Sequence, residues 1–356
     1  MLVGSSPAIE NPTTLDYPPL NGNDWQVSTP AEQGLDAMLV AELYLNADDV
    51  ETIKSLLVVM NGNLIAEGYF NGGTVEQKTN VMSVAKSYTS ALVGFPLEQG
   101  CLSSLDLKMM DFFPEFAGQI ADPRKEQITI RDLLQMRSGY PWEESDAALW
   151  DAHLPGDWLS LIDDFPLISD PGTEFHYSNL TAHWLGVIVT RACDTDLMSF
   201  SQEHLFSPID VEVGEWWQDR YGYYFPFFHF NARDAARFGL LYLNEGAYEG
   251  NQVISADWVH DSLQSYSEDP WITNKLGSHI GDISYGYQWL SATAGDHRFN
   301  FAWGHGGQLI VLLDQFDMIL VTTADPLNEL PPAEGWKYEK MVIDLVGEFI
   351  TSLPTE

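Results

Sequence analysis

Basic residues are scarce in this chain of 356 residues, where 16 Lys and Arg stand against 52 Asp and Glu and the formal net charge is −36. DNA and anionic membrane surfaces are bound through clustered Lys and Arg side chains, and the sequence contains no such cluster. We therefore expect no nucleic-acid partner and interpret the acidity as a solvated surface. The same negative field is expected to slow the approach of anionic substrates.

Cysteine is also rare, because Cys101 and Cys193 are the two cysteines of the chain and they form no Cys-x-x-Cys motif. The nine His include no His-Glu-x-x-His motif. The sequence therefore predicts no metal site and no cofactor, and it leaves open whether the two cysteines pair.

Long apolar runs are missing too. No stretch of 18 apolar residues occurs, so no membrane span is expected. The first residues lack a charged leader followed by a long apolar segment, so we expect no secretory signal. This expectation fits a cytoplasmic protein, or a periplasmic or secreted protein after processing, and the compartment stays open.

Apolar residues make up 45% of the chain, which is enough for a large core. Helices are predicted near both ends, at 31–46 and 339–353, and strands at 55–60, 64–70, 285–290, 309–313 and 318–323. Hairpins dominate, which predicts an α+β fold with an antiparallel sheet flanked by N- and C-terminal helices and a mostly helical inserted region. The expected divisions are an extended arm at 1–30, a sheet domain at 31–94 and 231–356, and a helical insertion at 95–230, with the active site between the last two.

A Ser-x-x-Lys motif from Ser83 to Lys86 occurs once, at the start of an apolar helix predicted over 82–94. Residues three apart lie on one face of a helix, so the hydroxyl and the amine are expected to be neighbours. A Ser hydroxyl needs a base to become a nucleophile, and burial lowers the pKa of a Lys toward that task. The same four residues also fit an exposed Ser and a solvated Lys, so context has to decide.

Two later segments supply this context. Tyr177-Ser178-Asn179 follows a Pro-Gly turn and precedes a predicted helix, and His305-Gly306-Gly307-Gln308 opens a late strand. With the Ser-x-x-Lys motif, they resemble the serine β-lactamase and penicillin-recognising enzyme family. The resemblance is to its class C-like branch, which carries Tyr-x-Asn and includes family VIII carboxylesterases, DD-peptidases and 6-aminohexanoate-oligomer hydrolases. His-Gly-Gly stands here in place of the family's Lys-Thr-Gly.

The resemblance implies a β-lactamase/transpeptidase-like fold and catalytic roles for three residues. Ser83 would attack an ester or amide carbonyl and form an acyl-enzyme. Lys86 and Tyr177 would share the proton transfers, and which of them is the base in each step stays open. The alternative for Tyr177 is an aromatic side chain that only packs.

The resemblance also implies substrate-binding residues. Asn179 would orient Lys86 and the substrate, and His305, Gly306 and Gly307 would form a wall of the site. The backbone N–H groups of Ser83 and Gln308 would form the oxyanion hole. The alternative for His305 is a strand-end histidine without a role.

The altered third motif lacks the Lys and Thr that usually hold a substrate carboxylate. We therefore predict a serine hydrolase acting on a small ester or amide, with a carboxylesterase as the leading prediction. The alternatives are a β-lactamase or DD-peptidase, and a 6-aminohexanoate-type amidase, to which residues 137–144 are weakly similar. A non-catalytic binding protein on the same fold is the alternative of another class. The sequence leaves the natural substrate and the oligomeric state open.

Overall fold

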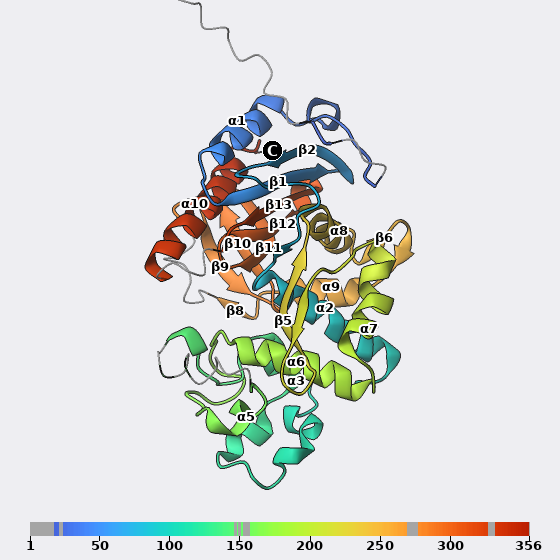
Figure 1. Cartoon of the computed structure of the whole chain (residues 1–356), viewed down its shortest axis with the longest axis vertical. Coiled ribbons are helices and arrows are strands. Elements are labelled where there is room, and N and C mark those ends of the chain that lie inside the picture. The colour runs from blue at the N-terminus through green and yellow to red at the C-terminus, as the bar shows by residue number, and fades with distance from the viewer. Residues whose placement is uncertain are drawn as a thin grey trace, which may run out of the picture.

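A computed structural model of the chain describes residues 18–20, 24–145, 148, 151, 157–268, 277–326 and 332–355. An eight-stranded antiparallel sheet with the order β2-β1-β13-β12-β11-β10-β9-β8 forms its centre (Figure 1). The chain therefore closes on itself, because the early strand β1 pairs with the last strand β13. The strands are β1 (Ile53–Met60), β2 (Asn63–Tyr69), β8 (Ser267–Glu268), β9 (Gly281–Tyr285), β10 (Leu290–Ala294), β11 (His297–Gly304), β12 (Gln308–Leu313) and β13 (Met318–Ala324).

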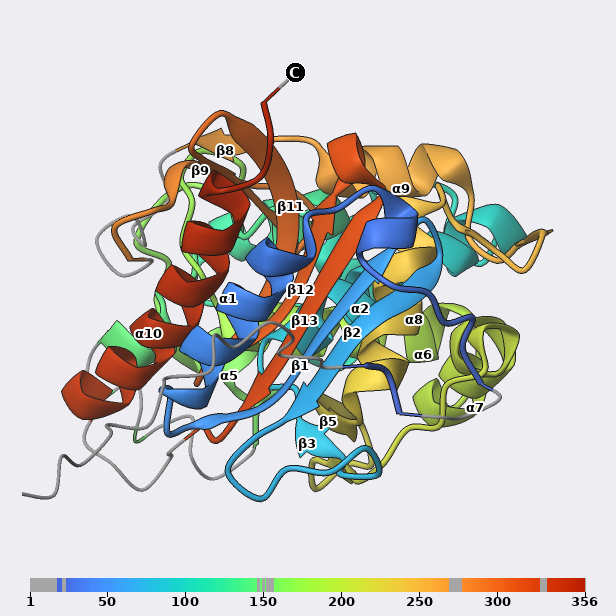
Figure 2. The same cartoon turned by 90° about the horizontal axis from the view of Figure 1, so that it is seen from above.

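Helices cover both faces of this sheet (Figure 2). Helices α1 (Ala37–Asp48) and α10 (Pro332–Thr351) pack together on one face, and α2 (Val84–Gln99) and α8 (Ala232–Leu243) cover the other. Strand β1 alternates between the two cores, since Leu57 and Val59 join the core under α2, whereas Leu56 and Val58 join the core under α10. This alternation is the period of two that a strand imposes on its side chains.

The remaining helices lie mostly on the far side of α2, below the sheet in Figure 1. They are α3 (Ile130–Leu134), α5 (Leu161–Asp164), α6 (Asn179–Ala192), α7 (Leu197–Ser201) and α9 (Ala256–Leu263), with small sheets of β3 (Thr79–Asn80), β5 (Tyr224–Phe230) and β4 (Trp216–Gln218), and of β6 (Ala247–Tyr248) and β7 (Asn251–Gln252). The α+β fold class predicted from the sequence is confirmed. The division into an arm, a sheet domain and a helical insertion remains a proposal.

Helices α2 and α6 pack side by side in a parallel sense. Their N-terminal ends carry Ser83 and Asn179, and their C-terminal ends are followed by Cys101 and occupied by Cys193. Both cysteines are half-buried free thiols. No helix in the described ranges is long and apolar enough to cross a bilayer.

The hairpin predicted from the strands at 55–60 and 64–70 forms, because the residues between these strands adopt the backbone conformation of a tight turn. Asn61 and Gly62 have φ values of 49° and 71° between β1 and β2, the left-handed pair that an Asn-Gly hairpin turn uses. The helix predicted at 31–46 instead begins at Ala37. Gly34, with φ 83°, ends a short 3-10 turn, and Asp36 caps the new helix by accepting from the backbone N–H of Met38.

The strand predicted at 285–290 is wrong. β9 ends at Tyr285, β10 begins at Leu290, and the four residues between them turn, with Gln288 at φ 58°. Ser87 of α2 donates a hydrogen bond to the Gln288 carbonyl at 2.7 Å. The aromatic residues of this connection are buried by other helices, because Trp289 packs against Phe238 of α8 and Tyr287 packs against Trp258 of α9. This burial resembles a strand pattern in the sequence.

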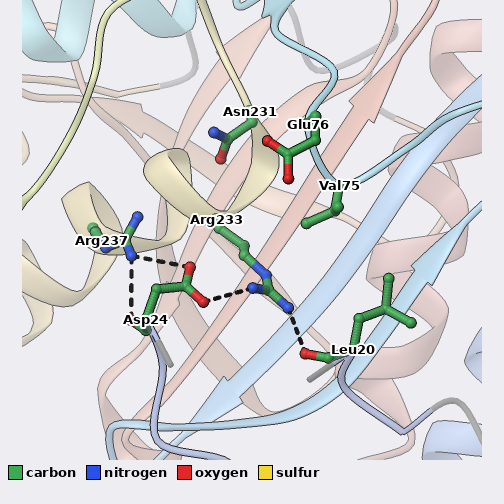
Figure 3. A pocket seen from close by; sticks show the side chains of 7 residues that line it. All are labelled: Leu20, Asp24, Val75, Glu76, Asn231, Arg233 and Arg237. Carbon is green, nitrogen blue, oxygen red and sulfur yellow. Dashed lines mark hydrogen bonds and ion pairs between the residues drawn. The ribbon is translucent and has the colours of Figure 1, made fainter. Parts of the chain in front are cut away.

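Two arginines of α8 hold the described part of the N-terminal arm (Figure 3). Arg233 donates to the Leu20 carbonyl at 2.8 Å and to Asp24 Oδ1 at 2.7 Å, and it also pairs with the buried Glu67 of β2 at 2.7 Å. Arg237 donates to the Asp24 carbonyl and carboxylate, each at 3.2 Å. A cavity of about 240 Å³ beside them contains none of the predicted site residues in its lining. Residues 1–17 and 21–23 of the predicted arm lie outside the described ranges.

Candidate active site

Ser83 is the N-cap of α2, and it follows Met82, whose φ of 51° is left-handed. Lys86 Nζ donates a hydrogen bond to Ser83 Oγ at 2.9 Å, and Lys86 as a whole is 1% exposed. Burial lowers the pKa of Lys86 to about 8, although the charges of Glu144 and Glu143 oppose this shift. The solvated-Lys alternative is therefore wrong, and the buried amine has a neutral fraction near pH 7 that an exposed Lys lacks.

Tyr177 completes a compact group with this pair. Its hydroxyl shares a hydrogen bond with Ser83, and the Lys86 ammonium lies 5.0 Å from the centre of its ring. Burial raises the pKa of Tyr177 well above 10, with further upward contributions from Tyr285 and Glu144 that outweigh the lowering effect of Ser83. The phenol therefore keeps its proton at neutral pH.

Asn179 begins α6 beside this group, but its side chain is engaged elsewhere. Asn179 Nδ2 donates to Glu144 Oε1 at 3.1 Å, whereas Lys86 Nζ donates to Ser83 Oγ, and the orientation of Lys86 by Asn179 remains a prediction. The amide is therefore held by an exposed carboxylate, a partner that the motif does not reveal.

Glu143 is a buried carboxylate that the sequence analysis missed. It accepts from Ser178 Oγ and from the backbone N–H groups of Asn179 at 2.9 Å and Leu180 at 3.2 Å. These donors form the first turn of α6, so one side chain caps the helix and fixes the strand-like segment that carries Tyr177. Burial raises the pKa of Glu143 although these hydrogen bonds oppose it. An acid directly after the apolar Pro141-Trp142 pair was the available signal in the sequence.

Aromatic rings form apolar walls around the catalytic group. Phe227 of β5 has its ring centre 5.7 Å from Lys86 Nζ. Trp142 meets Tyr177 edge to face, with the ring centres 6.5 Å apart. These rings keep water from part of the Lys86 surroundings and so contribute to its lowered pKa.

The third motif forms the turn between β11 and β12. A Cβ atom added to Gly304 would lie 2.4 Å from the carbonyl oxygen of Val81, two residues before Ser83. Because Gly304 has no Cβ, the turn can pack directly against the segment that leads to Ser83.

Gly306 and Gly307 both have left-handed backbones, with φ values of 88° and 97°. A Cβ on Gly307 would lie 2.7 Å from the Cβ of Val342 in α10, and one on Gly306 would lie 2.5 Å from Pro326 Cα. The structure therefore supplies two independent reasons, conformation and space, why glycine stands at both positions.

His305 is oriented by Glu339 of α10, a second residue that the sequence analysis missed. Its Nδ1 lies 2.7 Å from Glu339 Oε2, and the same carboxylate oxygen accepts from the backbone N–H of Gly306 at 3.0 Å. Burial of the imidazole lowers its pKa, but Glu339, by hydrogen bond and charge, and Glu144 outweigh this and raise the pKa of His305 overall. His305 is thus tied to a buried acid, unlike a strand-end histidine without partners.

Gln308 is fixed through its side chain to the end of β13. Its Nε2 donates to the Ala324 carbonyl at 2.7 Å, and its Oε1 accepts from the Ala324 backbone N–H at 3.0 Å. This pair of bonds extends the sheet beyond the ladder and sets the position of the Gln308 backbone. The use of its N–H in an oxyanion hole remains a prediction.

Comparison with known proteins places this geometry in a family. The sequence profile of the Beta-lactamase family matches residues 54–316. A 6-aminohexanoate-dimer hydrolase of Paenarthrobacter ureafaciens is 25% identical over 315 residues, which are 83% of this chain and 79% of that protein. The Beta-lactamase-like protein 2 of Dictyostelium discoideum is 25% identical over 199 residues, which are 54% of this chain and 34% of that protein.

Solved structures show the same fold at lower identity. A Bacillus anthracis protein provisionally named a 6-aminohexanoate-dimer hydrolase aligns with a TM-score of 0.68 and 22% identity over 87% of this chain and 83% of its own. Simvastatin synthase (LovD) from Aspergillus terreus aligns with a TM-score of 0.66 and 15% identity over 89% of this chain and 100% of its own. Because the family profile covers most of the chain and includes the Ser83 and Tyr177 motifs, the chain belongs to the Beta-lactamase family.

Proposed function

We propose that this chain is a serine hydrolase that forms an acyl-enzyme on Ser83 and acts on a small ester or amide, most readily as a carboxylesterase. The observation that carries the proposal is the 2.9 Å hydrogen bond between Lys86 Nζ and Ser83 Oγ at a Lys that is 1% exposed. A nucleophile and its base within hydrogen-bond reach, in a site that lowers the pKa of the base, are the structural requirements of nucleophilic catalysis.

The two pKa shifts support one assignment of the proton transfers in acylation. Neutral Lys86 takes the Ser83 proton as the oxygen attacks the carbonyl carbon, since its pKa of about 8 leaves a neutral fraction at pH 7. Tyr177, whose pKa is raised, gives its proton to the leaving alcohol or amine and regains one from Lys86. The Ser–acyl bond forms, the ester or amide bond breaks, and the site returns to its starting protonation.

In deacylation water attacks the acyl carbon and neutral Lys86 takes its proton, while Tyr177 gives its own proton to Ser83 Oγ as the Ser–acyl bond breaks and then regains one from Lys86. The backbone N–H groups of Ser83 and Gln308 are the proposed donors to the oxyanion in both steps, and such donors are worth about 3 to 4 kcal/mol each in other hydrolases. The Gln308 side chain supports this role because its bonds to Ala324 hold the backbone in place.

The preference for esters rests on the turn that replaces Lys-Thr-Gly. The protonated imidazole of His305 supplies the positive charge of that turn, and the negative charge of the Glu339 carboxylate beside it offsets this charge. A β-lactam or peptide carboxylate would therefore meet a weaker positive charge here than a free Lys provides. We expect hydrolysis of β-lactams to be slight.

An amide substrate is the second candidate. It is favoured by the likeness to the 6-aminohexanoate-dimer hydrolase of Paenarthrobacter ureafaciens, which spans 83% of this chain. Amide cleavage needs protonation of the departing nitrogen, and Tyr177 is the donor available for that step. Release of a free amine from a linear amide dimer is the assay for this candidate.

Intact-mass measurement after exposure to p-nitrophenyl butyrate and, separately, to nitrocefin tests the proposal. We expect an acyl adduct on the wild-type chain with the ester, no adduct on Ser83→Ala, and faster turnover of the ester than of nitrocefin. Clear preference for nitrocefin would overturn the carboxylesterase proposal. Full hydrolysis by Ser83→Ala, or failure of a fluorophosphonate to label Ser83, would overturn the serine mechanism.

A further inference from the structure

Glu144 is an exposed carboxylate beside Asn179, next to the buried Glu143. Its Oε1 accepts from Asn179 Nδ2 at 3.1 Å. Its backbone is held in place, because the carboxylate of Glu143 is anchored to the first turn of α6. The position of Glu144 relative to Asn179 is therefore set by a buried cap and not by a free surface loop.

The charge of Glu144 reaches the whole catalytic group. Its negative charge makes an upward contribution to the pKa of Lys86, of Tyr177 and of His305, although burial lowers the pKa of Lys86 overall. The charge of Glu144 thus acts on groups of both the helix side and the turn side of the site. Among the described residues no Lys or Arg forms an ion pair with it, since the Lys86 amine is bonded to Ser83 and His305 is paired with Glu339.

Two consequences follow for a substrate. An acceptor group, such as a carbonyl or carboxylate, competes with Glu144 for the Asn179 amide and meets a negative charge beside it. A cationic group instead finds an accessible carboxylate to pair with, in a protein whose net charge of −36 already attracts cations.

We infer that Glu144 selects substrates that carry a cationic, amine-derived group near the scissile ester or amide. The inference rests on the proposed hydrolase function and adds the charge class of its substrate. Glu144 is here a specificity-determining residue, which pairs with the substrate and takes no part in proton transfer.

Three p-nitrophenyl esters that differ mainly in charge provide the test: the cationic 4-(trimethylammonio)butyrate, its neutral isostere 5,5-dimethylhexanoate and the anionic hydrogen adipate. We expect kcat/KM of the wild-type chain to be roughly five times higher for the cationic ester than for the neutral one, the size of an exposed ion pair, and lowest for the adipate. Glu144→Gln should bring the first two values together. Added NaCl should reduce the wild-type preference, because salt screens exposed charges.

Glu42→Gln is the matched control. Glu42 is an exposed acid of α1, on the sheet face opposite α2, and its substitution changes the net charge by the same single unit. We expect this variant to keep the wild-type preference. In Glu144→Gln the rising limb of the pH profile for the neutral ester should also move to lower pH, since the charge that raises the pKa of Lys86 is gone.

The outcomes separate the inference from the proposed function. If all three esters are hydrolysed without preference for the cationic one, or if Glu144→Gln and Glu42→Gln keep the same preference, the inference is overturned and the hydrolase function stands. If none of the esters is hydrolysed and Ser83 takes up no acyl group, the proposed function itself fails.

Discussion

The two sides of the site are held in place by different physical means. The helix wall, which we define as Ser83, Lys86, Tyr177 and Asn179, is positioned by hydrogen bonds among buried polar side chains, with Glu143 at its base. The turn wall, which we define as residues 304–308, is positioned by left-handed glycines and by close packing against α10. The helix wall brings titratable side chains together, whereas the turn wall consists mainly of backbone held in a fixed conformation.

This difference predicts how each wall responds to substitution. Changes in the helix wall should alter rate and pH dependence with little change in folding, because the titrating groups are there. Changes in the turn wall should alter stability first, because backbone conformation and packing define it. Four substitutions test this contrast, in order of decreasing expected effect.

Lys86→Met should lower kcat/KM for p-nitrophenyl butyrate by about 10²- to 10⁴-fold, the range of a general base. Thermal stability should stay the same or rise, because a buried amine is replaced by an apolar side chain of similar length. The wild-type profile of kcat/KM should rise with pH through an apparent pKa near 8 as Lys86 loses its proton. A flat wild-type profile between pH 6 and 9, or near-normal activity of the variant, would contradict this role.

Gly307→Ala should destabilise the fold by about 2 to 4 kcal/mol, since it adds left-handed strain to a steric contact with Val342. Gly250→Ala is the matched control, because Gly250 has a φ of 79° and no atom within 4 Å of an added Cβ. The control should cost only the conformational part, about 1 to 2 kcal/mol. Urea unfolding measures both variants, and equal losses would show that packing against α10 does not define the turn.

Glu143→Gln should lower stability by about 1 to 3 kcal/mol, because an amide cannot accept from all the donors of the first α6 turn. Its charge also raises the pKa of Lys86, so the rising limb of the pH profile should move to lower pH. Thermal unfolding and kcat/KM against pH are the two measurements. A loss of stability without a shift of the rising limb of the pH profile would show that Glu143 caps α6 but does not influence the pKa of Lys86.

Glu339→Gln should have the smallest effect, about 1 kcal/mol. The pKa of His305 in the folded chain is raised above 6.5, mainly by Glu339 working against burial, so the folded state binds that proton more tightly than the unfolded chain. The stability that the variant loses should therefore be largest below pH 6.5 and shrink as pH rises through the folded-state pKa. In a His305→Gln background the substitution should show no such pH dependence, and urea unfolding at several pH values distinguishes the two cases.

The sequence alone was informative where neighbouring residues decide the structure. The Asn61-Gly62 turn lies between the strands predicted at 55–60 and 64–70, and both strands form. Thr129 and Asn231 cap α3 and α8 through the backbone N–H three residues later, so these caps are also short-range features. The Ser83–Lys86 contact is of the same kind, because helical spacing creates it. The strand predicted at 285–290 is wrong because its aromatic residues are buried by α8 and α9, whose contacts the local sequence does not reveal.

The sequence analysis missed the carboxylates of Glu143 and Glu339 because their partners are also far away in the chain. Glu143 meets the α6 turn 35 residues later, and Glu339 meets His305 across 34 residues, so no local pattern pairs them. Glu339 nevertheless carried a signal, because it lies three and seven residues before the buried Val342 and Val346 on the apolar stripe of α10. An acid on such a stripe needs a buried partner.

The parallel packing of α2 and α6 has an electrostatic consequence. Each helix ends in a partial positive charge at its N-terminus, so two such charges converge on the site, each worth about 0.3 to 1 kcal/mol to a nearby anion. Glu143 neutralises that of α6 with a full carboxylate. Helix α2 has no acid in its own first turn, so its partial positive charge favours negative charge that develops on a carbonyl oxygen bound beside Ser83.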